Sequence, residues 1–156
     1  WHYLISLSRS LLNSLYFDDI RVGDTYTADS YNIPFDEMLE FNRLWDPLQI
    51  HLDETAAMQA GHTAIIGSGQ YTLCIKQYFI NQMPWREAVI GSIGFDSLRF
   101  RNPVHGEDSI SVRVECTEKR ESKSKPDRGI CKFDVIMSNQ NDELVLTYTD
   151  IVMIKK

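Results

Sequence analysis

The feature that most constrains the fold is a change of hydrophobic period near residue 88. Before it, residues 64–84 place Ile, Leu and Phe on most sides of a predicted helix, so we expect that helix to be buried. After it, apolar and polar residues alternate with a period of two, which is typical of β-strands. The expected strands are residues 88–103, 108–122, 128–140 and 143–156. One buried helix followed by an antiparallel meander predicts an α+β fold, a curved sheet wrapped around a central helix.

Shorter elements are expected before the central helix. Alternating residues 25–33 predict a first strand, and residues 34–45 and 53–61 predict two helices. Pro34 suits the first turn of the earlier helix, and Pro47 marks its end. We expect Asp53 to be the N-cap of the later one.

The length of 156 residues predicts a single domain, residues 16–156, after an N-terminal extension of residues 1–15 whose status the sequence leaves open. That extension is too short and too polar to span a bilayer, and it lacks the pattern of a signal peptide. We therefore expect no membrane association. The net charge of −6 argues against a nucleic-acid partner.

The three cysteines, Cys74, Cys116 and Cys131, have spacings that fit neither a disulfide framework nor a metal site. A reducing compartment, the cytoplasm, fits this pattern. Because their neighbours are mostly apolar, we expect all three to be small buried residues.

The stretch LWDPLQIHLDETAA, residues 44–57, places a carboxylate and an imidazole five positions apart, at Asp46 and His51. An imidazole exchanges protons near neutral pH, and a nearby carboxylate can hold a water molecule and orient the ring. The pair is therefore a candidate for proton transfer. Each residue also has a purely structural interpretation, Asp46 as a turn or cap residue and His51 as a half-buried, hydrogen-bonded side chain.

The central helix is expected to begin in the Gly67, Ser68, Gly69 segment. A helix N-terminus offers unpaired N–H groups and a partial positive charge, and glycine lets a ligand approach the backbone closely. Ser68 could donate to a ligand or cap the helix. We assign His62 and His105 to loops, and the histidines show no metal-ligand spacing, so no metal is expected.

Residues 16–155 resemble the MaoC-like acyl dehydratases, hot-dog proteins that include the (R)-specific enoyl-CoA hydratases. The segments that carry the resemblance are YFDDIRVGD (16–24), WDPLQIHLDETAA (45–57), AIIGSGQYT (64–72) and LRFRNPVHGEDSISVRVECTEKRESKSKPDRGI (98–130). The chain departs from the family motif at three positions. Trp45 replaces a Gly before the catalytic Asp, and Leu48 and Gln49 replace Gln and Pro in the loop. Trp45 is expected to narrow the substrate pocket.

The resemblance implies a lyase of fatty acid metabolism that hydrates a trans-2-enoyl-CoA or dehydrates the 3-hydroxyacyl-CoA. The catalytic pair of the family falls on Asp46 and His51, and the backbone N–H that holds the thioester oxygen falls near Gly69. No cofactor is implied, since coenzyme A is part of the substrate. Two alternatives remain open: an acyl-CoA thioesterase, which would not need His51, and a non-catalytic acyl-CoA-binding protein.

The expected working unit is a homodimer or a higher even oligomer. The resemblance implies it, and joining two sheets would bury exposed strand edges and form a tunnel for the substrate. We expect the strand with Phe95, Leu98 and Phe100 to contribute to that tunnel, and Arg99 or Arg101 to lie near the phosphates of coenzyme A.

Overall fold

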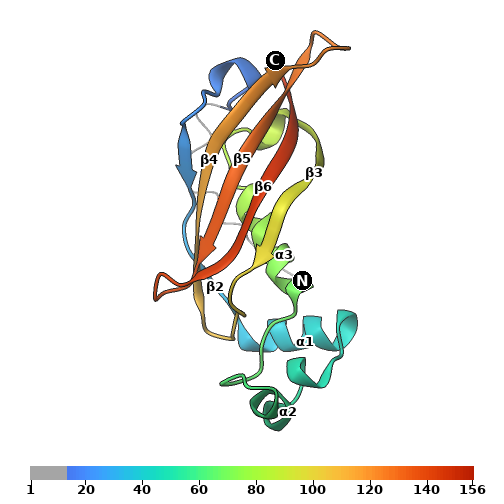
Figure 1. The fold of residues 1–156 in the computed structure, drawn as a ribbon, viewed down its shortest axis with the longest axis vertical. Coiled ribbons are helices and arrows are strands. Elements are labelled where there is room, and N and C mark those ends of the chain that lie inside the picture. The colour runs from blue at the N-terminus through green and yellow to red at the C-terminus, as the bar shows by residue number, and fades with distance from the viewer. Residues whose placement is uncertain (1–13) are drawn as a thin grey trace.

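A computed structural model gives the structure of residues 14–156, a curved sheet that wraps around one long helix (Figure 1). The helices are α1 (Phe35–Trp45), α2 (Glu54–Gln59) and α3 (Gly69–Ile80), with short 3₁₀ helices η1 (Phe17–Asp19), η2 (Gln49–His51) and η3 (Arg86–Ala88). The strands are β1 (Thr25–Thr27), β2 (Tyr31–Asn32), β3 (Val89–Phe100), β4 (Ser109–Glu121), β5 (Arg128–Ser138) and β6 (Leu144–Lys155). The α+β hot-dog architecture is thus confirmed. The extension predicted for residues 1–15 lies almost wholly outside the described residues.

The strands run in the order β1-β4-β5-β6-β3, and every neighbouring pair is antiparallel. The meander expected for the last four strands is correct for β4, β5 and β6 but wrong for β3, which pairs with β6 on the far side. The connection from β3 to β4 is bonded to the segment before α3, where the N–H of Gly67 donates to the carbonyl of Val104 (2.8 Å). This crossing over the end of the sheet allows β3 to lie beyond β6.

The strand predicted for residues 25–33 is divided into β1 and β2 in the structure. Both pair with β4, at Tyr26 opposite Val114 and at Tyr31 opposite Ile110. Residues 28–30 between them belong to no strand. The alternating pattern therefore predicted strand residues correctly but not the interruption between them.

The core lies between α3 and the concave face of the sheet. Phe79 of α3 is completely buried, and Trp85 stacks flat on Phe133 of β5 with ring centroids 4.2 Å apart. The sheet covers only one side of the helix, so the expectation of burial on most sides was wrong. Cys74 and Tyr78 are exposed on the open side, which corrects the interpretation of Cys74, whereas Cys116 and Cys131 are buried as expected.

The two shorter helices, α1 and α2, lie beyond one end of the sheet, next to the first turn of α3 (Figure 1). They begin and end close to the predicted residues, because the prolines and Asp53 act as the sequence indicates. The Asp53 carboxylate accepts from the N–H of Ala56 (2.8 Å) and so caps α2. Within residues 14–156, no helix has both the length and the apolar character needed to cross a membrane.

Candidate active site

The Asp46 and His51 pair is built by the end of α1 and the turn that follows it. The N–H of Asp46 donates to the carbonyl of Asn42 (2.9 Å), and Asp46 then leaves the helical conformation (φ −151°) because a residue before proline disfavours it. The chain turns back through η2, where the N–H of His51 donates to the carbonyl of Leu48 (2.9 Å). The result is a separation of 3.6 Å between Asp46 Oδ2 and His51 Nε2.

The ring of His51 is held in one orientation and is only 6% exposed. Its Nδ1 lies 2.9 Å from the carbonyl oxygen of Ile66. A carbonyl can only accept, so Nδ1 carries the hydrogen, and in the neutral ring Nε2 keeps its lone pair on the side of Asp46. Because 3.6 Å is longer than a direct hydrogen bond, Asp46 Oδ2 and His51 Nε2 do not bind each other directly, and one water molecule beside the two atoms can contact both.

The amino end of α3 provides backbone donors beside this pair. Ser68 caps the helix, since its hydroxyl accepts from the N–H of Tyr71 (3.1 Å), so the capping alternative describes its side chain. Within residues 14–156, the N–H groups of Gly69 and Gln70 have no acceptor outside the helix, and first-turn N–H groups have none within it. These two N–H groups are available to a ligand.

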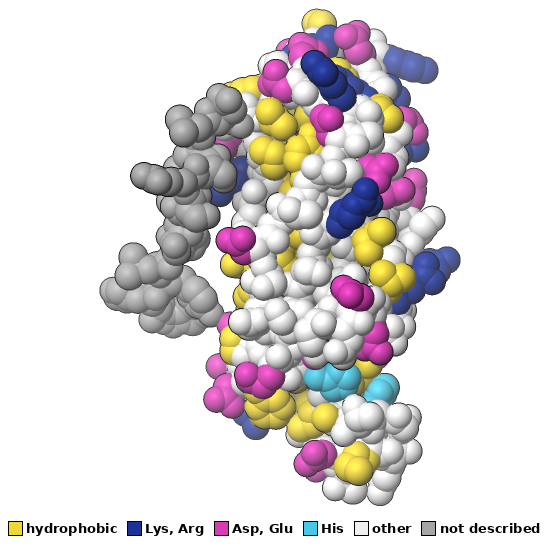
Figure 2. All heavy atoms as spheres, turned by 90° about the vertical axis from the view of Figure 1, so that its left-hand side faces the viewer, with side chains coloured by type: hydrophobic (Ala, Val, Ile, Leu, Met, Phe, Trp, Pro, Cys, Tyr) yellow, Lys and Arg dark blue, Asp and Glu magenta, His cyan; other side chains and the backbone are white. Residues whose placement is uncertain are grey.

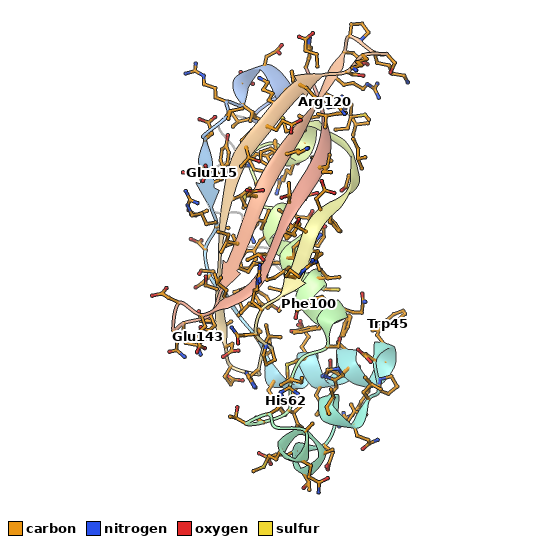
Figure 3. The ribbon with its side chains drawn as sticks, in the orientation of Figure 1. Trp45, His62, Phe100, Glu115, Arg120 and Glu143 are labelled. Carbon is orange, nitrogen blue, oxygen red and sulfur yellow. The ribbon has the colours of Figure 1, made fainter. Side chains whose placement is uncertain are left out.

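Both glycines of this segment permit close packing. A Cβ on Gly67 would lie 2.6 Å from Cγ2 of Val104, which the structure cannot accommodate without a shift. A Cβ on Gly69 would lie 3.1 Å from Cζ of Phe100, a ring that is half exposed and can move. Figure 3 shows Phe100 at the end of β3, next to the first turn of α3. Gly67 is thus required for packing, and Gly69 faces the space next to Phe100.

A pocket of about 300 Å³ opens at this place. It is lined by His51, Ile66, Gly67, Gly69, Thr72, Phe100, Arg101, Asn102 and Pro103. The structure therefore brings together His51, the glycines of α3 and the end of β3, with Asp46 in contact range of His51. This arrangement combines a proton acceptor, a carboxylate and backbone donors around a small and partly apolar pocket.

Trp45, by contrast, does not line this pocket within a single chain. Its side chain is 71% exposed, and Figure 3 shows it at the far end of α1. The expectation that it narrows the pocket is therefore not met by one chain alone. Of the two arginines, Arg101 lines the pocket and donates to Thr147 Oγ1 (3.0 Å), whereas Arg99 donates to the adjacent carbonyl of Leu98.

His62 and His105 are loop residues, as expected. His62 lies between α2 and α3, and His105 lies between β3 and β4, with its Nδ1 3.7 Å from Asp108 Oδ2. Figure 2 shows histidine side chains on one face of the molecule, between the sheet and the part formed by α1 and α2. In residues 14–156, no three His, Cys, Asp or Glu side chains are grouped as a metal site would require.

Asn42, which the sequence motifs did not single out, is completely buried beside the pair. Its Nδ2 donates to the carbonyls of His51 (3.0 Å) and Ile66 (3.2 Å), and its Oδ1 accepts from the N–H of Ser68 (3.1 Å). The signal was its position four residues after Met38, on the apolar side of α1. A polar residue on a buried helix face indicates specific hydrogen bonds.

A second polar cluster lies farther along α3, formed by the buried Lys76, Asp150 and Tyr148 together with the exposed Ser92. Burial lowers the pKa of Lys76 and raises the pKa of Asp150, and the attraction between the two charges opposes both shifts. Ser92 donates to Asp150 Oδ1 (3.2 Å), and the Lys76 ammonium lies 4.4 Å from the ring centroid of Phe95. The hydroxyl of Tyr148 is buried and has no partner among the described residues.

Comparison with known proteins gives a family match. Residues 19–135 match the family described as "MaoC like domain". Among curated proteins, the uncharacterized protein YdeM of Bacillus subtilis (strain 168) is 25% identical over 140 residues, 89% of this chain and 98% of that protein.

Solved structures show the same fold. The MaoC-like dehydratase of Rhodospirillum rubrum is 27% identical, with a TM-score of 0.85 over 91% of this chain and 97% of that one. The R-hydratase PhaJ1 of Pseudomonas aeruginosa superposes with a TM-score of 0.74 over 92% of this chain and 87% of that one. At 20% identity, the second likeness shows the fold alone.

Proposed function

Because this chain belongs to the MaoC-like domain family, we propose that it is a lyase that hydrates trans-2-enoyl-CoA or dehydrates 3-hydroxyacyl-CoA. The observation that carries this proposal is the hydrogen bond of His51 Nδ1 to the carbonyl of Ile66, which leaves Nε2 as a base facing Asp46. A buried imidazole held in that form, beside a carboxylate and a pocket, is suited to take a proton from water.

In the proposed hydration, one water molecule contacts both Asp46 and His51. As its oxygen forms a bond to C3 of the enoyl group, its proton passes to His51 Nε2, while Asp46 accepts a hydrogen bond from the second hydrogen. The π electrons move onto the thioester oxygen, which gives an enolate. A proton returned from the imidazolium to C2 then completes the addition, and dehydration is the reverse.

The amino end of α3 is proposed to stabilise the enolate. The charge develops on the thioester oxygen, and the N–H groups of Gly69 and Gln70 provide donors together with the positive end of the helix dipole. A substrate bound in the pocket would displace water from around the reacting atoms, which would strengthen these interactions. Arg101, on the pocket wall, is the residue we assign to the phosphates of coenzyme A. The reaction as written needs neither a metal ion nor a redox cofactor.

We also propose that two copies associate through β3. This strand has β6 on one side and lies at the end of the described sheet, so its other edge is open to pairing. Ile93, Phe95 and Phe100 are exposed on it. A second copy at this edge would cover these apolar side chains and extend the pocket into a tunnel.

The reaction is tested by adding crotonyl-CoA to the protein and following the loss of the enoyl absorbance. Hydration removes this absorbance without releasing a thiol, whereas a thioesterase releases free coenzyme A, which a thiol reagent detects. We expect hydration and no thiol release. Thiol release that survives the change His51→Ala would favour the thioesterase, and binding of acyl-CoA with neither signal would favour a non-catalytic binding protein.

Light scattering at micromolar concentration tests the assembly. We expect the mass of a dimer or of a higher even oligomer, and a loss of activity when dilution produces monomers. A fully active monomer would contradict the shared tunnel without touching the chemistry of Asp46 and His51.

A further inference from the structure

We propose that Asn42 is a positioning residue that holds the His51 base at a fixed place relative to the amino end of α3. This inference rests on the proposed function, because it assigns Asn42 a role in the same reaction. It concerns a residue that does not line the pocket and that acts only through its contacts.

Every hydrogen-bonding atom of the Asn42 side chain is used. Its two N–H groups donate to two carbonyls and its oxygen accepts from one N–H, although the side chain is completely buried. An amide is costly to bury unless it is hydrogen-bonded, and its neighbour on the helix face, Met38, is an apolar residue with the same complete burial. An apolar side chain would therefore suffice for packing, and the amide is explained by the three bonds.

Two of these bonds restrain His51 from both ends. The carbonyl of His51 accepts from Asn42 Nδ2 (3.0 Å), which fixes the backbone of η2. The carbonyl of Ile66 accepts from Asn42 Nδ2 (3.2 Å) and from His51 Nδ1 (2.9 Å), so Asn42 also fixes the acceptor that orients the ring. Asn42 thereby determines where Nε2 points, and it does so without contacting Nε2.

The third bond connects this base to the donors of α3. The N–H of Ser68 donates to Asn42 Oδ1 (3.1 Å), and Ser68 directly precedes Gly69. The backbone carbonyl of Asn42 in turn accepts from the N–H of Asp46 (2.9 Å). One residue therefore joins the carboxylate, the base and the backbone donors into a single rigid unit. Misplacement of reacting groups by about 1 Å can lower a rate by roughly 100-fold.

The change Asn42→Asp tests this role, because the carboxylate keeps the acceptor for Ser68 but loses both donors. We expect kcat for crotonyl-CoA to fall about 100-fold, with KM changed less than about threefold, since substrate contacts remain. In the His51→Ala background the same change should lower kcat less than about threefold, because the base that it positions is absent.

Asn139→Asp is the matched control. Asn139 is also a buried, hydrogen-bonded asparagine, and its Nδ2 donates to Glu143 Oε2 (2.8 Å) while its Oδ1 accepts from the N–H of Asn141 (3.0 Å). It lies in the turn between β5 and β6, outside the pocket. We expect this variant to lose thermal stability but to keep its kcat per folded molecule.

A second readout does not depend on catalysis. Nitrogen–proton correlation spectra distinguish the two neutral forms of an imidazole, and we expect His51 to carry its hydrogen on Nδ1 in the unchanged protein. In Asn42→Asp, or in Asn42→Ala if the first variant does not fold, the spectrum should show a mixture of forms. An unchanged His51 spectrum, or a kcat loss equal to that of Asn139→Asp, would overturn the positioning role. If the unchanged protein does not hydrate enoyl-CoA, the proposed function is refuted. The His51 spectrum then still tests whether Asn42 holds the ring in one form.

Discussion

Two buried polar clusters contact the same helix and differ in how completely their atoms are paired. At the amino end of α3, Asn42, His51 and Ser68 bind to one another and to backbone carbonyls, and every polar atom of the Asn42 side chain is used. About two turns farther along, Lys76 and Asp150 are buried as opposite charges, and the hydroxyl of Tyr148 beside them is unpaired.

This difference distinguishes a candidate site, whose side chains are held in place by hydrogen bonds, from a part of the core whose charges are costly to bury. The first cluster adjoins a pocket and holds one ring nitrogen, His51 Nε2, at its edge beside Asp46. The second places two charges where burial disfavours both, as the opposite shifts of their pKa values show. Hydrogen-bond completeness and the adjoining pocket, rather than burial of charge, are the features that mark the first cluster as the candidate site.

The largest expected effect is a loss of activity when residues of the first cluster are changed, with little loss when residues of the second are changed. His51→Ala and Asp46→Asn should each lower kcat for enoyl-CoA about 1,000-fold, since general acid–base catalysis typically contributes 10²–10⁴-fold. Because the two side chains act on one water molecule, the double variant should lose little more than either single variant. Steady-state rates of the three variants check this, with Lys76→Met as the comparison. Multiplicative losses in the double variant would show that the two residues act independently.

The second prediction distinguishes the clusters by stability. Lys76→Met should lower the free energy of unfolding at pH 7 by about 3 kcal/mol, because it leaves the Asp150 carboxylate buried without its cation. Adding Asp150→Asn should recover most of this loss. Chemical denaturation of the single and double variants measures both values, and activity per folded molecule should change less than about threefold.

The pH dependence of the stability loss in Lys76→Met tests the same assignment, because the raised pKa of Asp150 fixes the direction in which this loss changes with pH. Burial raises the pKa of Asp150 above the ordinary value that it has in the unfolded chain, so the folded protein binds the extra proton more tightly. The destabilisation should therefore be largest at neutral pH and shrink as the pH falls toward the raised pKa. A loss of stability that grows on acidification would contradict this assignment.

The sequence predicted the positions of Asp46 and His51 because prolines and short polar motifs act locally. Pro47 ends α1 at the residue expected, and Asp53 caps α2 as its residue type indicates. The place of β3 beside β6 depends on a long-range connection across the end of the sheet, which no local period encodes. Asn42 was missed for a related reason, since its partners are up to 26 residues away in the chain. Cys74 was placed wrongly because an apolar helix pattern does not tell how many sides a sheet will cover.

The third prediction compares the two glycines before and in the first turn of α3. Gly67→Ala should lower the free energy of unfolding by about 1–3 kcal/mol, because its Cβ would overlap with Val104. Gly69→Ala should leave stability within about 1 kcal/mol, since the Phe100 ring can move and alanine favours the helix. Its methyl group enters the pocket, so kcat/KM should fall about tenfold. Equal activity of Gly69→Ala and the unchanged protein would show that substrate does not occupy the space that the Gly69 Cβ would enter.

The smallest expected effect concerns Trp45, at the edge of the candidate site. The indole is 71% exposed in one chain, so Trp45→Gly should change thermal stability little beyond the helix penalty of glycine, about 1 kcal/mol. Trp45 directly precedes Asp46, and an exposed indole is a large rigid apolar surface that an acyl chain or a second copy can cover. We expect its removal to raise kcat/KM for long enoyl-CoA substrates about threefold relative to crotonyl-CoA, a difference of less than 1 kcal/mol.

Rates along a series of acyl lengths measure the shift, and Leu44→Gly, which removes a neighbouring exposed side chain of α1, is the matched control. An unchanged profile would place Trp45 outside the substrate path. The amino end of α3 and the end of β3 would then remain as the boundaries of the pocket.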